Sequence, residues 1–255
     1  MTAIKTATAR PKPALLISDA SFMKLKALIF DVDGTIANTE REGHLPACNE
    51  AFVRLNYLVQ WSWAEYKQLL PLPGTQARVR QTLVDCQPGL AGAALDEAVE
   101  EFTAVKRQIY LEKFATAPTL RPGVKELVAE AVVHNLKLAI VTLSHEAQVK
   151  AMLQIQMPNY ASVFNPILGK MAGPKHARGS PLYTRCLAEL DLPRDEVLVI
   201  EDSEGGTAAA VEAGLPVMVV YNDYTENGRF PGARLITPTL ASFTLEQLSF
   251  LCLES

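Results

Sequence analysis

The chain has 255 residues, of which 49% are hydrophobic and 20% charged, so it is long enough to bury a substantial core. Its formal net charge of -4, with no clustered run of Lys and Arg, argues against a nucleic-acid-binding surface. The longest apolar stretches fall short of the roughly 18 residues that a membrane-spanning helix needs. The four cysteines are widely spaced and form no CxxC pair, so we expect reduced cytosolic thiols, without a disulfide framework or a metal knuckle.

Residues 1–22 show no clear periodicity and carry three basic residues with no acid before Asp19. They could form a targeting segment, which would place the protein in the plastid stroma, but they contain no long apolar region. The alternative is that Met23 is the natural start, because it lies directly before the first predicted strand. Residues 1–23 would then be a disordered or misassigned leader, and the protein would be cytoplasmic.

The strongest local signal lies in residues 26–35. Residues 27–30 are an unbroken apolar run, as expected for a strand that is buried on both faces. Alternation along the strand end places Asp31 and Asp33 on the same side, and Gly34 allows a sharp turn after them. Carboxylates at the end of a buried strand are unfavourable unless their charge is used. We therefore interpret both aspartates as functional residues, with a surface turn as the alternative.

Residues 38–118 contain helical periodicity and no apparent strand. Proline and glycine at 71–74 interrupt this block, and a second cluster of helix-breaking residues at 117–123 ends it. The apolar spacing predicts helices over residues 44–58, 64–70, 76–84 and 95–114. We expect residues 38–118 to form an all-helical cap inserted after the first strand.

From residue 124 onward, helices and apolar strands alternate. The pattern predicts helices over 124–133, 146–154, 181–190 and 206–213, strands over 136–141, 163–168, 197–200 and 217–220, and an edge strand at 235–236. Such alternation indicates a parallel sheet covered by helices on both faces. The predicted fold class is α/β: a Rossmann-like core of residues 24–37 and 119–255, with the helical cap as an insertion.

Polar side chains follow three of these strands. Asp31 and Asp33 follow the first, Thr142 and Ser144 follow the strand at 136–141, and Glu201 and Asp202 follow the strand at 197–200. Ligands of open parallel sheets bind at the carboxyl ends of the strands, so we expect these groups to converge.

The convergence would crowd four carboxylates into one site. Two carboxylates about 4 Å apart repel by roughly 4 kcal/mol at an effective dielectric near 20. A bound cation removes this penalty, and hard oxygen ligands suit Mg²⁺. We therefore expect Mg²⁺ at this site; a metal-free acid/base pair is the alternative, although it needs only two of the four carboxylates.

Two motifs carry a family resemblance. Residues 31–35, Asp-Val-Asp-Gly-Thr, resemble the first motif of the haloacid dehalogenase (HAD) superfamily, and residues 201–214 fit its EDSxxGxxAAxxAG pattern at every specified position. The resemblance implies that Asp31 is a nucleophile that forms an aspartyl-phosphate, while Asp33 protonates the leaving group and then activates water. It also implies phosphoryl contacts from Thr142 and Ser144, and Mg²⁺ ligation by Asp31, the Asp33 carbonyl, Asp202 and, directly or through water, Glu201.

The lysine motif departs from the family pattern. Relatives usually show Lys-Pro-x-Pro-Asp-x-Tyr, whereas residues 175–183 read Lys-His-Ala-Arg-Gly-Ser-Pro-Leu-Tyr. We assign Lys175 as the cation that neutralises the phosphoryl group. Lys170 and Arg178 are the alternatives, and a solvated basic loop without a role in the site is a third interpretation.

The cap is similar to that of the beta-phosphoglucomutase-like and CbbY-like branch, which the segments at 39–44 and 49–52 resemble. CbbY-type phosphatases are linked to xylulose-1,5-bisphosphate. Their Gly-Gly-Lys-Glu-Arg-like cap segment corresponds here to residues 73–78, which keep a glycine and Arg78 but lose the Lys-Glu pair. We expect Arg78 to bind a distal phosphate, with an exposed helical arginine as the alternative, and Glu40 and His44 to line the cleft.

The sequence thus predicts a monomeric, Mg²⁺-dependent phosphatase that hydrolyses a small phosphosugar. The nearest alternative is a phosphomutase with the same site. An alternative from another class is a catalytically inactive HAD-fold binding protein.

Overall fold

The computed structural model describes residues 24–115 and 117–253. The leader expected at residues 1–23 lies outside them, so the start of the chain and the cellular location that depends on it stay predictions. Among the described residues, no helix combines the length and apolar composition that crossing a membrane requires.

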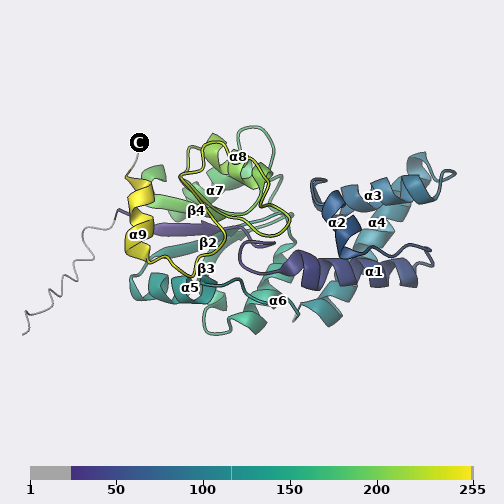
Figure 1. Cartoon of the computed structure of the whole chain (residues 1–255), viewed down its shortest axis with the longest axis horizontal. Helices are drawn as coiled ribbons and strands as arrows, with labels where there is room; N and C mark the ends of the chain where they lie inside the picture. Colours follow the sequence, from purple (N-terminus) through teal and green to yellow (C-terminus); the bar gives the residue numbers. More distant parts are fainter. Residues whose placement is uncertain (1–23, 116, 254–255) are drawn as a thin grey trace, which may run out of the picture.

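A six-stranded parallel sheet forms the centre of the larger part of the molecule (Figure 1). Its spatial order is β3-β2-β1-β4-β5-β6, so the chain builds one half of the sheet outward from β1 and then returns to β4. At such a switch point a crevice opens outside the carboxyl ends of the two central strands. The strands are β1 (Ala27–Phe30), β2 (Lys137–Val141), β3 (Phe164–Leu168), β4 (Val197–Glu201), β5 (Val217–Val220) and β6 (Leu235–Thr237). The predicted Rossmann-like sheet is confirmed.

The side chains of β1 alternate between two cores. Leu28 and Phe30 pack on one face with α5, α6 and α9, whereas Ala27 and Ile29 pack on the other with α7 and α8 (Figure 1). All four residues are buried, which explains the uninterrupted apolar run. The covering helices are α5 (Val124–Val133), α6 (Glu146–Gln156), α7 (Pro181–Leu190), α8 (Glu204–Glu212) and α9 (Leu245–Ser249), with the 3-10 turns η4 (Ala161–Val163), η5 (Arg194–Glu196) and η6 (Phe250–Cys252).

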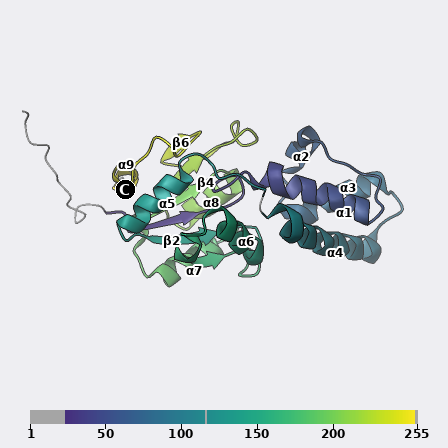
Figure 2. The ribbon, with the colours of Figure 1, turned by 90° about the horizontal axis from the view of Figure 1, so that it is seen from below.

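The remaining helices form a separate layer beyond the carboxyl ends of the strands (Figures 1 and 2). This cap has its own apolar core, in which the ring of Phe52 contacts those of Trp61 and Phe102 at centroid distances of 4.8 and 4.5 Å. The two connections to the sheet run side by side, since Ala37 pairs with Leu120 in an antiparallel bridge. The cap elements are the π-helical turn η2 (Glu40–His44), α1 (Leu45–Arg54), α2 (Trp63–Leu69), α3 (Gly74–Cys86), α4 (Gly92–Ile109) and the π-helical turn η3 (Tyr110–Phe114).

Several helix ends differ from the predictions. The helix expected over 44–58 ends at Arg54, because Asn56 adopts a left-handed backbone conformation with φ of 57° and leaves Leu58 fully exposed. The helix expected over 206–213 begins two residues earlier, where the Ser203 hydroxyl accepts a hydrogen bond from the amide of Gly206 and caps α8. The short α9 was not predicted, since five residues are too few to show helical periodicity.

The packing of the cap core generates a stability prediction. Phe52→Ala removes a fully buried ring, so we expect it to lower the free energy of unfolding by about 3–5 kcal/mol. The neighbouring Val53 is 70% exposed, and Val53→Ala is expected to change stability by no more than about 0.5 kcal/mol. Urea unfolding followed by tryptophan fluorescence measures both changes, because Trp61 lies against Phe52. Equal losses in the two variants would contradict this account of the core.

Candidate active site

The carboxyl ends of β1, β2 and β4 bring four of the expected site residues to one edge of the sheet. Asp31, Thr142, Glu201 and Asp202 are all buried there. Carboxylate oxygens of Asp31, Glu201 and Asp202 lie within 4.8 Å of one another. The register explains the placement, since Phe30 pairs with both Ile140 and Ile200, and the polar residues follow within two positions on each strand.

A buried lysine joins two of these carboxylates. The Nζ of Lys175 lies 2.5 Å from Asp31 Oδ1 and 2.5 Å from Glu201 Oε1. Of the two alternatives, Arg178 is exposed, and Lys170 is exposed and donates a hydrogen bond to Gln76 in the cap. The structure therefore brings Lys175, and neither of the other two cations, to the acidic cluster.

Both oxygens of Glu201 are held by the protein. Oε1 accepts hydrogen bonds from Lys175 and, at 3.1 Å, from the Tyr183 hydroxyl. Oε2 accepts from the backbone amides of Asp202 and Ser203 and from the Ser203 hydroxyl. A Cβ atom at Gly206 would lie 1.9 Å from Oε1, so only glycine fits beneath this carboxylate. The arrangement fixes Glu201 as an anchor for Lys175.

The cluster contains more negative charge than its one lysine balances. Burial raises the pKa of Asp31 well above the usual aspartate range, although the charge of Lys175 opposes the shift. Burial together with the charge of Glu201 raises the pKa of Asp202 to about 8. A second cation would stabilise the ionised carboxylates, and a set of hard oxygen donors fits a divalent ion such as Mg²⁺. Asp31 and Asp202 are the residues that would hold it.

The carboxylate of Asp33 points to a different set of partners. It accepts hydrogen bonds from the hydroxyls of Thr39 and Ser144, each at 2.5 Å, and from His44 Nε2 at 3.0 Å. Burial alone would raise the pKa of Asp33, but the charge and hydrogen bond of His44, with the two hydroxyls, lower it well below the usual range. Asp33 is therefore ionised in this arrangement. The acidic cluster holds three carboxylates, from Asp31, Glu201 and Asp202.

His44 connects Asp33 to a buried lysine of α4. The Nζ of Lys106 lies 2.8 Å from His44 Nδ1, on the opposite side of the ring from Asp33. Either the ammonium donates to a neutral imidazole, or an imidazolium donates to a neutral amine, and Nε2 donates to Asp33 in both cases. Burial lowers the pKa of Lys106. No motif identified Lys106 in the sequence.

Glu40 and Arg78 form a buried ion pair at the base of the cap. Arg78 Nη1 lies 3.1 Å from both carboxylate oxygens of Glu40, and the Tyr66 hydroxyl donates to one of them at 2.7 Å. Burial is the largest influence and would raise the pKa of Glu40, but the charges of Arg78 and His44 and the hydrogen bond from Tyr66 together lower it. Arg78 is only 8% exposed, so it differs from the exposed helical arginine that was the alternative interpretation.

Two further polar residues hold the loop around Gly34 and were missed from sequence. Asn222 donates to Asp202 Oδ2 at 2.7 Å, on the side of the carboxylate opposite the contact from Thr35. The buried guanidinium of Arg121 donates to four backbone carbonyls, those of Gly34, Val220, Tyr221 and Pro238. Asn222 is 20 positions from Asp202, and Arg121 is up to 117 positions from its carbonyl partners, so no local pattern could have identified these contacts.

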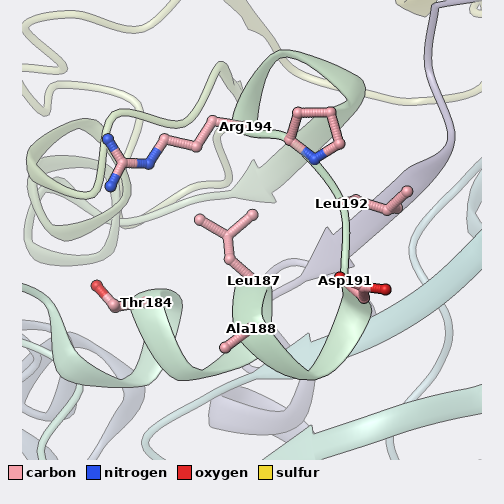
Figure 3. A pocket seen from close by; sticks show the side chains of 7 residues that line it. Thr184, Leu187, Ala188, Asp191, Leu192 and Arg194 are labelled. Atoms are coloured by element: carbon pink, nitrogen blue, oxygen red, sulfur yellow. The ribbon is translucent and has the colours of Figure 1, made fainter.

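A surface pocket elsewhere on the sheet domain lies away from these groups. It is located where α7 ends and η5 leads into β4, at the amino end of the strands (Figure 3). Its lining residues are Thr184, Leu187, Ala188, Asp191, Leu192, Pro193 and Arg194. The acidic cluster lies at the opposite edge of the sheet, at the carboxyl ends of the strands.

Comparison with known proteins agrees with this geometry. The sequence model of the haloacid dehalogenase-like hydrolase family matches residues 28–220. The chain is 35% identical over 224 residues to Protein CbbY of Rhodobacter capsulatus, which covers 86% of this chain and 96% of that protein. It is 30% identical over 215 residues to the CBBY-like protein of Arabidopsis thaliana, and the match covers 81% of this chain and 66% of that protein.

Solved structures of CbbY have the same fold. CbbY from Rhodobacter sphaeroides in complex with phosphate superposes with a TM-score of 0.78 at 30% identity, covering 88% of this chain and 99% of that one. A variant of that protein in complex with xylulose-(1,5)bisphosphate also gives a TM-score of 0.78, at 29% identity and the same coverage. The chain therefore belongs to the haloacid dehalogenase-like hydrolase family, and within it to the CbbY-like branch of phosphohydrolases.

Proposed function

We propose that the protein is a Mg²⁺-dependent phosphatase that hydrolyses a small sugar phosphate through an aspartyl-phosphate intermediate. The observation that carries the proposal is the contact of Asp31 with Lys175 beside Asp202, in a buried site at the strand ends. A nucleophilic carboxylate next to a buried cation suits attack on a phosphoryl group, whose charge must be neutralised in the transition state.

The chain's own residues account for both halves of the reaction. A carboxylate oxygen of Asp31 attacks phosphorus as the bond to the sugar oxygen breaks, and Asp33 gives that oxygen a proton. In the second half Asp33 removes a proton from water, which attacks the phosphorus and releases phosphate and free Asp31. Mg²⁺, when bound by Asp31 and Asp202, supplies electrostatic stabilisation of the phosphoryl charge. Thr142 and Ser144 contact the phosphoryl group.

His44 is placed to supply the proton that Asp33 needs in order to protonate the leaving group. Because the pKa of Asp33 is lowered, this carboxylate needs a nearby proton source before it can act as an acid. His44 Nε2 lies 3.0 Å from Asp33 Oδ1, and Lys106 lies behind the ring. We infer that this pair supplies the proton to Asp33 and recovers it when water is activated.

We propose a sugar bisphosphate, with xylulose-1,5-bisphosphate as the leading candidate, as the substrate. The support is the likeness to CbbY, one solved structure of which contains that compound. Arg78 is the proposed contact for the second phosphate. Its hydrogen bonds to Glu40, Tyr66 and Leu72 use Nη1 and Nε, so Nη2 is the nitrogen that would meet a ligand.

Asp31→Asn tests the nucleophile. The amide is a poor nucleophile, so we expect phosphate release from a phosphosugar panel to fall by a factor on the order of 10³ or more, with an unchanged circular dichroism spectrum. Asp195→Asn, at an exposed aspartate before β4, is the matched control and should retain full activity. Retained activity in Asp31→Asn with any member of the panel would refute the assignment. Product analysis of the same reactions separates a phosphatase, which releases phosphate, from a mutase, which returns an isomerised phosphosugar.

Removal of divalent cations tests the metal. We expect dialysis against EDTA to abolish phosphate release and added Mg²⁺ to restore it, because the buried carboxylates need a second cation. Mg²⁺ should also raise the thermal unfolding midpoint of the dialysed protein, since it binds the folded state. Activity that persists in EDTA would overturn the metal assignment.

Arg78→Ala tests the second phosphate. A lost charge-assisted hydrogen bond is worth about 1.5–3 kcal/mol, so KM for a sugar bisphosphate should rise about 10- to 100-fold while KM for the matching monophosphate changes little. Comparing the two substrates separates phosphate binding from any general loss caused by leaving Glu40 buried without its partner. Arg80→Ala is the control, because this exposed arginine lies on the same helix as Arg78 and pairs with Asp96 of α4. A parallel rise in both KM values would contradict the proposed contact.

A further inference from the structure

The segment at 222–224, which begins two residues after the end of β5, lies between the acidic cluster and the cap. At one end Asn222 donates a hydrogen bond to Asp202 Oδ2. Its own side-chain oxygen accepts from the amide of Tyr224 at 3.1 Å, which holds the segment in a tight turn. One residue that positions a carboxylate of the cluster therefore also fixes the backbone of Tyr224.

The hydroxyl of Tyr224 is buried in the site without a hydrogen-bond partner among the described residues. It lies above Gly34, where an added Cβ atom would be 2.1 Å from the hydroxyl oxygen and 2.5 Å from Asp202 Oδ2. The φ of 91° at Gly34 reserves this position for glycine and so keeps the space open. A buried hydroxyl with no partner costs about 1–3 kcal/mol, so its presence needs an explanation, and a bound ion, water or ligand is one.

The surroundings of this hydroxyl define the chemistry of the ligand. The strongest charges that act on Tyr224 are those of Asp202, Glu40, Asp33 and Asp31, in that order. Arg121 also interacts with Tyr224, but one guanidinium is outnumbered by four carboxylates, so the space beside the hydroxyl favours a cation and its attached oxygen ligands. The hydroxyl can donate to a water on the divalent cation or to a phosphoryl oxygen.

The same segment contacts the cap through Trp63 of α2. The rings of Trp63 and Tyr224 meet edge to face, with centroids 5.8 Å apart. Trp63 Nε1 also donates to Asp223 Oδ2 at 3.1 Å, and Lys67, one turn later on α2, lies 3.7 Å from the same oxygen. These contacts join the cap to the sheet domain. A displacement of the Tyr224 ring would therefore change the surroundings of Trp63 in the cap.

We propose that Tyr224 is a ligand-binding residue of this site: its hydroxyl donates to an oxygen of the bound Mg²⁺–phosphate group, and its ring couples occupancy of the site to the cap through Trp63. The inference rests on the proposed function, because it takes Mg²⁺ and phosphate as the occupants. It adds a contact from the loop after β5 to those from β1, β2, β4 and the lysine loop.

Tryptophan fluorescence tests the coupling. Trp61→Phe leaves Trp63 as the only tryptophan, and Trp61 lies in the cap core, away from the acidic cluster. In this background, Mg²⁺ and then inorganic phosphate with Mg²⁺ are titrated against proteins with Tyr224 or with Tyr224→Phe. We expect a saturable change in Trp63 emission, with an apparent affinity about 10- to 100-fold weaker in Tyr224→Phe. If the affinity of Tyr224→Phe is already weaker for Mg²⁺ alone, the acceptor is a cation-bound water. If the affinity is weaker only when phosphate is added, the acceptor is a phosphoryl oxygen.

Thermal unfolding separates ligand binding from a structural role. Without ligand, Tyr224→Phe removes only an unpaired hydroxyl, so its unfolding midpoint should equal or exceed that of the parent. Saturating Mg²⁺ and phosphate should raise the unfolding midpoint of the parent more than that of the variant. Tyr57→Phe, at a partly buried cap tyrosine that packs on Phe52, is the control and should match the parent in every titration.

Two results would overturn the inference: identical titration curves for Tyr224 and Tyr224→Phe, or a variant destabilised equally with and without ligand. These outcomes differ from failure of the proposed function, which would appear as absence of phosphate release across the phosphosugar panel. If the panel yields a substrate and Tyr224→Phe binds phosphate like the parent, only the role of Tyr224 is refuted.

Discussion

The site depends on an excess of buried negative charge at the carboxyl end of the sheet. Three carboxylates from two adjacent strands lie within 4.8 Å, and one lysine lies among them. Burying carboxylates without sufficient cations is unfavourable, so the surrounding residues serve to hold and orient these groups. Tyr183 and the start of α8 hold Glu201, and Asn222 and Thr35 hold Asp202. The charge that remains is what makes the site suitable for a divalent cation and a phosphoryl group.

The cap takes part in this electrostatic arrangement. Asp33 belongs to the sheet domain, but two of its three side-chain partners, Thr39 and His44, come from the segment that leads into the cap, and Lys106 behind His44 belongs to α4. Trp63 adds a second connection through the loop after β5. A movement of the cap would therefore change the surroundings of Asp33, the proposed acid/base residue, as well as access to Asp31, the proposed nucleophile.

The family relationship and the geometry address different questions. Similarity to CbbY establishes the branch, whereas the contacts of Arg78 and Glu40 bear on the substrate. The cap segment at 73–78 contains an arginine, Arg78, whose charge is balanced by the buried Glu40. An arginine already paired in this way is held in place before a ligand arrives, which would reduce the entropic cost of binding the proposed second phosphate.

The sequence by itself determined the parallel sheet, its covering helices except the short α9, and the residues at the strand ends, because apolar runs and alternating elements are local patterns. It also placed Asp31, Asp33, Thr142, Glu201 and Asp202 after three strands, since parallel strands end at one edge. Only the tertiary structure decided which of three nearby cations reaches the carboxylates: Lys175 is buried, while Lys170 and Arg178 are exposed. The same holds for Lys106, Arg121, Asn222 and Tyr224, whose roles arise from contacts with residues far away in the chain. Spacing along a sequence cannot specify such contacts, because the packing of the cap and of the loops against the sheet creates them.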